Sequence, residues 1–215
     1  ADKKMRVWNA ADGAQIREHD STEVVRAIAI SWDNQRIAAG CDDKNIRVWN
    51  LGDGNLFATY TGHSDKITAL EYSRDNAKLL SSSADGTVRG WNLMLGRQTQ
   101  HFVAAGGGAI NGVSWLTDNV NFAFAGADKN VYWDTYAIQL LHVADEKRVN
   151  ALHVHLNSAH HFTVGDDGVV KWWDAGGGTL VRDFKGHTGP VRSVALHPNQ
   201  QYLATGGSDK KLKLW

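Results

Sequence analysis

Two sets of side chains in this sequence combine the residue types of a nucleophilic hydrolase, namely a histidine, a hydroxyl and an aspartate. The sets are His63, Ser81 and Asp85, and His187, Thr205 and Asp209. In a hydrolase the histidine accepts the proton of the hydroxyl and the aspartate orients the histidine. Here both sets share one spacing, 22 residues from histidine to aspartate, and a tryptophan follows six residues later, Trp91 or Trp215. Because the spacing recurs, we interpret the sets as structural hydrogen-bond networks that satisfy buried polar groups, and we expect no catalytic residues.

The tryptophans of these sets belong to a longer series. Six of them, Trp8, Trp49, Trp91, Trp133, Trp173 and Trp215, are 41, 42, 42, 40 and 42 residues apart. A period of about 40–45 residues that ends in a Trp-Asp-like pair is typical of the four-stranded blade of a β-propeller. No linker interrupts the period, so we predict one continuous array over residues 1–215.

Alternating apolar residues and turn residues predict short strands throughout the repeat. In the last copy, strands are expected at residues 191–196, 202–205 and 212–215, and a fourth strand follows each tryptophan, as at residues 56–60. Asp85-Gly86 and Asp167-Gly168 fit two-residue hairpin turns, and Asp43, Asp128 and Asp209 take the same place before a lysine. The chain is therefore predicted to be all-β, built of four-stranded antiparallel blades.

At this point the sequence resembles the WD-repeat β-propeller family over essentially its whole length. Members carry Gly-His before the innermost strand, Ser or Thr on the second strand, Asp in the next turn and Trp on the third strand, typically joined by hydrogen bonds. Complete sets are Gly62-His63, Ser81, Asp85 and Trp91, and Gly186-His187, Thr205, Asp209 and Trp215. The resemblance implies a non-enzymatic scaffold that binds a protein or peptide partner on the channel-mouth face.

The other copies depart from this pattern. The expected histidine and hydroxyl are replaced by Ser21 and Ala39 before Trp49, and by Gly106 and Phe124 before Trp133. The copy ending at Trp173 keeps Thr163 and Asp167 but has Asp145 in place of the histidine. We expect packing to stabilise these blades.

Two sets of apolar residues recur on the first strand of each blade. They are Ile28, Leu70, Val113, Leu152 and Val194, and Ile30, Tyr72, Trp115, Val154 and Leu196. Residues two apart in a strand share one face, so we predict that both sets are buried. Trp115 is accordingly interpreted as a core residue.

Polar residues follow the start of each first strand and should surround the mouth of the central channel. They are Arg26, Thr68, Asn111, Asn150 and Arg192. The predicted partner-binding face consists of Glu23, Arg26, Asp42, Asp65, Lys66, Lys147, Arg148, Asp166 and Arg192. Their mixed charge favours a partner chosen by complementary charged pairs.

An alternative places function on the blade that carries His153, His155, His160 and His161, as a metal-binding or enzymatic propeller. Imidazoles on one face of a strand can bind a metal. However, His155 starts a turn and His160 and His161 point to opposite faces, so the four need not converge. We therefore predict no metal and no cofactor. The glycine-rich residues 106–108 and 176–178 lack the following helix and lysine of a phosphate-binding loop.

The composition limits the remaining function classes. Lys plus Arg and Asp plus Glu both number 23, so no net charge attracts the chain to nucleic acid or to a membrane. Cys41 is the only cysteine, which excludes a disulfide within the chain and fits a reducing compartment. No apolar stretch reaches the roughly 18 residues of a membrane helix. We expect a cytoplasmic protein.

The ends of the sequence leave the assembly open. Residues 2–8 and 209–215 are near copies, as though the array continued past both. We favour five repeats of a larger, seven-bladed propeller, with further blades missing or supplied by another chain, or with self-association. A closed five-bladed ring is the alternative. A designed or duplicated repeat array without a partner is also compatible with the sequence.

Overall fold

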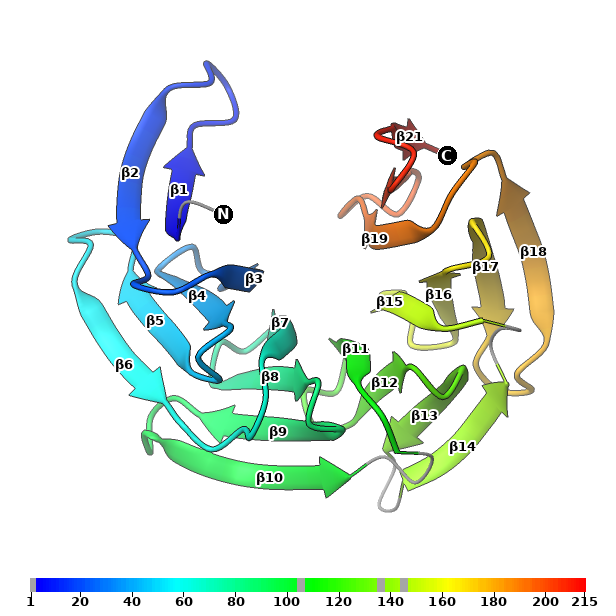
Figure 1. Cartoon of the computed structure of the whole chain (residues 1–215), viewed down its shortest axis with the longest axis horizontal. Helices are drawn as coiled ribbons and strands as arrows, with labels where there is room; N and C mark the ends of the chain where they lie inside the picture. Colours follow the sequence, from blue (N-terminus) through cyan, green and yellow to red (C-terminus); the bar gives the residue numbers. More distant parts are fainter. Residues whose placement is uncertain (1–2, 104–106, 135–137, 144–146) are drawn as a thin grey trace. The chain divides into compact units, whose positions relative to one another are not determined.

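The chain is an all-β protein made of antiparallel sheets, as the repeat predicts (Figure 1). The computed structural model describes residues 3–103, 107–134, 138–143 and 147–215. The chain divides into two compact units, Ala1–Phe102 and Val103–Trp215. The predicted fold class, a β-propeller of four-stranded blades, is confirmed.

The first unit contains a two-stranded sheet and two four-stranded blades, counted over its described residues. The two-stranded sheet pairs β1 (Lys4–Trp8) with β2 (Gln15–Asp20). The next blade consists of β3 (Val25–Ile30), β4 (Arg36–Cys41), β5 (Ile46–Asn50) and β6 (Leu56–Tyr60). The last blade consists of β7 (Ile67–Tyr72), β8 (Lys78–Ser83), β9 (Thr87–Asn92) and β10 (Arg97–Val103), which ends at the boundary between the units.

The second unit contains two four-stranded blades and a three-stranded sheet in its described part. The first blade consists of β11 (Ile110–Trp115), β12 (Phe122–Gly126), β13 (Asn130–Asp134) and β14 (Ile138–Val143). The second consists of β15 (Val149–Val154), β16 (His160–Gly165), β17 (Val169–Asp174) and β18 (Leu180–Lys185). The three-stranded sheet consists of β19 (Val191–Leu196), β20 (Leu203–Gly207) and β21 (Leu212–Leu214).

The turn between the second and third strands has the same backbone in every blade. The residue after the turn aspartate has a positive φ, 79° at Gly86 and 80° at Gly168, where glycine meets no steric penalty. Lysine adopts the same conformation in the other copies, with φ of 71° at Lys44 and Lys129 and 62° at Lys210. The aspartate side chain compensates by accepting a backbone N–H two residues later, as Asp85 does from Thr87.

Apolar residues of the first strands pack against the preceding blade of the same unit, as Tyr72 does with Val48 and Val154 with Trp133. Tyr72, Trp115 and Val154 are 1%, 5% and 4% exposed, as predicted. The prediction is wrong for Ile28 and Ile30, which are 51% and 50% exposed, and Val194 and Leu196 are only partly buried. Among the described residues, the sheet before β3 consists of β1 and β2, and β1 packs through Met5 against β4 and β5. The face of β3 that carries the two isoleucines therefore stays open.

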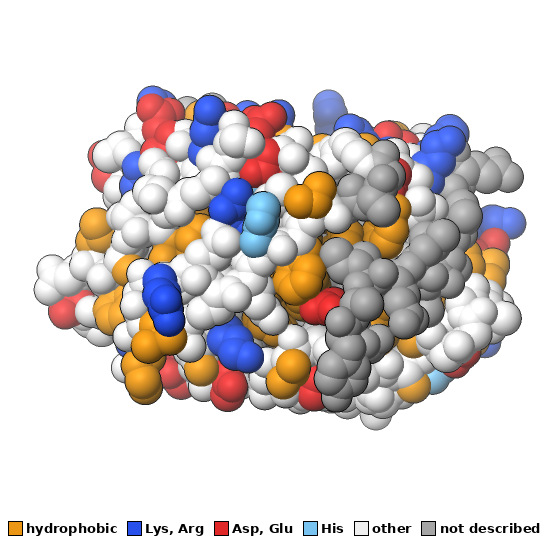
Figure 2. Space-filling model, turned by 90° about the horizontal axis from the view of Figure 1, so that it is seen from below, with side chains coloured by type: hydrophobic (Ala, Val, Ile, Leu, Met, Phe, Trp, Pro, Cys, Tyr) orange, Lys and Arg blue, Asp and Glu red, His pale blue; other side chains and the backbone are white. Residues whose placement is uncertain are grey.

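Charges of both signs are mixed on the surface. Figure 2 shows one side of the molecule, where Lys and Arg lie among Asp, Glu and hydrophobic side chains. This mixture agrees with the equal numbers of acidic and basic residues. None of the described residues belongs to a helix that is long and apolar enough to cross a membrane.

Candidate functional site

Each blade has an edge at which its first strand begins and its turn between the second and third strands lies. The strand pairing shows this directly, because the first residue of the first strand pairs with the last residue of the second, as in Val25 with Cys41 and Val191 with Gly207. We call this edge the rim of a blade. The predicted partner-binding residues lie at or next to the rim.

The polar residue after the start of each first strand lies at an irregularity of the sheet. The register shifts between Val25 and Ala27 in β3, and the same shift recurs in β7, β11, β15 and β19. A β-bulge leaves its extra residue out of the ladder and redirects its side chain. The skipped residues are Arg26, Thr68, Asn111, Asn150 and Arg192. The repeated bulge thus turns the predicted polar residues toward the rim.

In the first unit two ion pairs form among the rim charges. Arg26 donates from Nε and Nη2 to the two oxygens of Asp42, at 2.7 and 2.8 Å. These hydrogen bonds hold the pKa of Asp42 below its ordinary value, outweighing the effect of burial. Glu23 forms an ion pair with Lys3 at 3.4 Å. Both charges of the Arg26–Asp42 pair are thus engaged within one blade.

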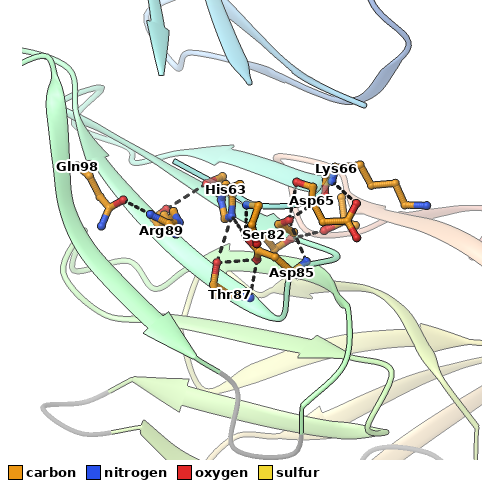
Figure 3. Close-up of polar contacts among 12 residues, drawn as sticks. His63, Asp65, Lys66, Ser82, Asp85, Thr87, Arg89 and Gln98 are labelled. Carbon is orange, nitrogen blue, oxygen red and sulfur yellow. Dashed lines mark hydrogen bonds and ion pairs between the residues drawn. The ribbon is translucent and has the colours of Figure 1, made fainter. Parts of the chain in front are cut away.

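Asp65 and Lys66 lie beside the start of β7, next to a buried polar cluster (Figure 3). The backbone N–H of Lys66 donates to Asp65 Oδ1 at 2.7 Å. Ser83 Oγ donates to the carbonyl of Asp65 at 2.9 Å, which ties this loop to the end of β8. The loop is therefore held in place by its own blade.

In the second unit two asparagines bridge neighbouring blades. Asn111 Nδ2 donates to the carbonyl of Val149 at 2.7 Å, and Asn150 Nδ2 donates to the carbonyl of Val191 at 2.8 Å. Each bulged asparagine thus holds the first strand of the blade that follows. The sequence predicted polar residues here but not their bridging role.

One carboxylate in the second unit receives several donors. Asp166 Oδ1 accepts from Asn150 at 2.9 Å and from Arg192 at 3.1 Å, and Asp166 Oδ2 lies 3.3 Å from Arg148 Nε. Burial would raise the pKa of Asp166, but the hydrogen bond from Asn150 and the two positive charges lower it below its ordinary value. Lys147, the residue before Arg148, is exposed.

The complete hydrogen-bond set of the β7–β10 blade forms a continuous chain, and Figure 3 shows its end at His63 and Asp85. Trp91 Nε1 donates to Ser81 Oγ at 2.8 Å, Ser81 Oγ lies 2.8 Å from His63 Nε2, and His63 Nδ1 lies 2.9 Å from Asp85 Oδ2. Since the indole can only donate and the carboxylate only accept, we assign a neutral His63 that carries its proton on Nδ1. Burial lowers the pKa of His63 more than Asp85 raises it, which agrees with this assignment.

The second set has the same geometry in the β19–β21 sheet. Trp215 Nε1 donates to Thr205 Oγ1 at 2.9 Å, His187 Nε2 lies 2.9 Å from Thr205 Oγ1, and His187 Nδ1 lies 3.0 Å from Asp209. The His63 and His187 side chains have no exposed surface. A substrate cannot reach either hydroxyl through its histidine, so the geometry supports a structural role.

Blades without the histidine provide another partner for the turn aspartate. The partner lies four residues later on the third strand. Arg47 Nη2 is 2.6 Å from Asp43, Tyr132 Oη donates to Asp128 at 2.5 Å, and Lys171 Nζ is 2.8 Å from Asp167. The blade of Trp173 also keeps the hydrogen bond from Trp173 Nε1 to Thr163 Oγ1, at 2.8 Å. Asp145 and Gly106, which replace histidine in two copies, lie outside the described residues.

The four histidines of the alternative hypothesis divide between two faces. His161 is buried against Trp133 and Trp173, whereas His155 and His160 face each other with ring centroids 6.0 Å apart. In the described part of the chain, no three His, Cys, Asp or Glu side chains are arranged to hold a metal ion. Cys41 is buried, and burial raises the pKa of its thiol.

Comparison with known proteins gives the family. The WD40 family (WD domain, G-beta repeat) matches residues 13–50, 54–92, 138–174 and 178–215. The chain belongs to the WD40 family. WD40 proteins generally act as scaffolds for interactions between proteins, and the relatives of this chain fit that description.

Curated WD40 relatives are similar over nearly the whole chain. Cilia- and flagella-associated protein 52 of Macaca fascicularis is 24% identical over 100% of this chain and 38% of its own length. Autophagy-related protein 16 of Arabidopsis thaliana is 23% identical over 97% of this chain and 33% of its own length. Serine-threonine kinase receptor-associated protein of Dictyostelium discoideum is 27% identical over 100% of this chain and 73% of its own length. The chain thus spans less than half the length of the first two.

Proposed function

We propose that this chain is a non-enzymatic scaffold that binds a protein or peptide partner at the rims of its blades. The observation that carries the proposal is the repeated bulge, which directs a polar side chain to the rim in each blade that has a first strand. Arg26 and Arg192 are about half exposed yet fixed by hydrogen bonds. Side chains that are ordered before binding lose less entropy when a partner arrives.

The buried histidine sets support a non-enzymatic role. Their hydroxyls and imidazoles are used within the blade and are closed to solvent. The mixed rim charges support selection of a partner by complementary pairs, which controls the rate of encounter and the specificity more than the affinity. They also support a protein partner over nucleic acid, which needs a continuous basic surface.

The test is a selection of binders from a random peptide library displayed on phage. Peptides selected on the wild-type chain should lose binding to the double variant Arg26→Glu, Arg192→Glu. The matched control is Arg97→Glu, Arg182→Glu, which reverses two exposed arginines on the fourth strands β10 and β18 and should keep binding. Selected peptides that bind the rim variant as well as the wild type would rule out the rims as the binding surface.

A further inference from the structure

The two bulged arginines, Arg26 and Arg192, occupy equivalent positions in their blades but have different partners. Arg26 pairs with Asp42, which lies on the turn between the second and third strands of its own blade. Ser208 occupies the corresponding position beside Arg192 and donates to the carbonyl of Pro190 at 2.9 Å. Because Ser208 stands where the first unit has Asp42, Arg192 reaches across to Asp166 of the preceding blade.

Asp166 has two other partners besides Arg192. It accepts from Asn150 and forms an ion pair with Arg148. Two guanidinium groups therefore share one carboxylate, whereas Asp42 in the first unit binds the single guanidinium of Arg26 through both of its oxygens. One negative charge cannot neutralise two positive ones, so this group of described side chains keeps a positive charge.

Both guanidinium groups also keep donors for a ligand. A guanidinium carries five N–H donors in a planar fork. Among the described residues, Arg148 meets Asp166 through Nε, and Arg192 reaches Asp166 and Asn150 through Nη1. The side chains of Arg148 and Arg192 are 46% and 49% exposed. Lys210, which lies on the turn between β20 and β21, is also exposed.

We propose that Arg148 and Arg192 form a subsite for a carboxylate side chain of an acidic peptide segment in the partner. The subsite deepens the function proposed above and rests on it. The carboxylate accepts hydrogen bonds from the unused nitrogens of the two forks, and Asp166 and Asn150 hold the arginines in place for it. Charge-assisted bonds of this kind are about twice as strong as neutral ones.

The test measures fluorescence anisotropy of a fluorescein-labelled tetraglutamate peptide, with tetraglutamine as the neutral probe. We expect tetraglutamate alone to bind, and added salt to weaken the binding because the site is exposed. Arg148→Gln and Arg192→Gln should each weaken it about tenfold, since each removes a charge-assisted bond. Arg182→Gln, the matched control, changes an exposed arginine on the fourth strand β18 and should leave binding unchanged. Asp166→Asn removes the competing charge but keeps a side-chain oxygen that can accept from Arg192, and it should strengthen binding.

Tryptophan fluorescence and circular dichroism of each variant verify that it is folded. The subsite is wrong if both arginine variants bind tetraglutamate as the wild type does, if Arg182→Gln weakens binding equally, or if tetraglutamate does not bind at low salt. The wild-type chain could fail to bind tetraglutamate while its selected peptides still lose binding to the Arg26→Glu, Arg192→Glu variant. That result would refute the acidic preference alone. Selected peptides that bind this variant as well as the wild type would refute the proposal that partners bind at the rims.

Discussion

Two neighbouring blades of the first unit each bury a tryptophan at the equivalent position, but different interactions hold it. In the β7–β10 blade, Trp91 is the start of a hydrogen-bond chain that ends on Asp85. In the β3–β6 blade, Trp49 has Ala39 where Ser81 would be, and it packs in an apolar cluster with Met5 and Ile37. The turn aspartate of that blade, Asp43, is bound by Arg47 instead of a histidine.

The difference shows that the strand pattern of a blade does not depend on the polar chain. Both blades have four antiparallel strands with the same bulge in the first. What changes is the consequence of losing one group. A buried polar chain leaves unpaired donors and acceptors when one member is removed, whereas an apolar cluster loses only contacts. The β7–β10 blade should therefore be more sensitive to single polar substitutions and to pH.

The largest effect is expected for Ser81→Ala. The substitution leaves both Trp91 Nε1 and His63 Nε2 without their partner in a buried site. Each orphaned group costs about 1–3 kcal/mol, so the free energy of unfolding should fall by about 3 kcal/mol. Urea denaturation and hydrogen exchange of the β8 and β9 amides measure this loss.

Ser82→Ala is the matched control, because Ser82 is equally buried but bonds to the half-buried Thr68, which can turn toward water. Its cost should stay near 1 kcal/mol. Equal losses from the two alanine variants would mean that the chain from Trp91 to Asp85 does not act as a unit.

A smaller effect is expected for Asp85→Asn, and it should depend on pH. Burial would raise the pKa of Asp85, but hydrogen bonds from Thr87, Ser64 and His63 lower it to about 2, from an ordinary value of 3.8. A lowered carboxyl pKa stabilises the fold above the ordinary pKa, and that contribution is lost as the pH falls through the folded value. At pH 7 it amounts to about 2 kcal/mol.

The variant should therefore be less stable than the wild type at neutral pH, and the difference should shrink between pH 4 and pH 2. Separately, the lowered pKa of His63 makes the fold less stable as the pH falls below 6.5, because the unfolded chain then binds a proton first. Asp43→Asn, in the more exposed ion pair of the β3–β6 blade, should show a weaker pH dependence. A difference between wild type and Asp85→Asn that is the same at pH 7 and pH 2 would contradict the assigned pKa.

The sequence predicted the repeat and the strands because tryptophan, turn aspartate and apolar alternation are local signals that recur at one period. It could not predict that Ile28 and Ile30 are half exposed, since their exposure depends on which strands lie opposite. The bulge at Arg26 and its equivalents was also missed, because the pattern of the strand is the same with or without one skipped residue.

Partners across the repeat were the hardest to predict. Arg192 and Arg26 look alike in the sequence, and only the structure shows that one reaches to the preceding blade while the other stays in its own. The i+4 partners of the turn aspartates, Arg47, Tyr132 and Lys171, differ in type, so no single motif marks them. The only sequence signal for these partners is their fixed spacing, four residues after the turn aspartate.

The smallest effect is expected for Thr87→Val, a member of the polar cluster that the sequence motif did not include. Thr87 Oγ1 donates to Asp85 Oδ1 at 2.7 Å and lies 3.1 Å from His63 Nδ1, and it is 8% exposed. Valine keeps the shape but removes one hydrogen bond, which costs about 1 kcal/mol, while the links from Trp91 to Asp85 remain. Because that bond also lowers the pKa of Asp85, the variant should raise this pKa, as NMR titration would show. The other complete network has Lys211 at this position, so an unfolding cost as large as that of Ser81→Ala would show that Thr87 is part of the chain itself and that the two networks are not equivalent.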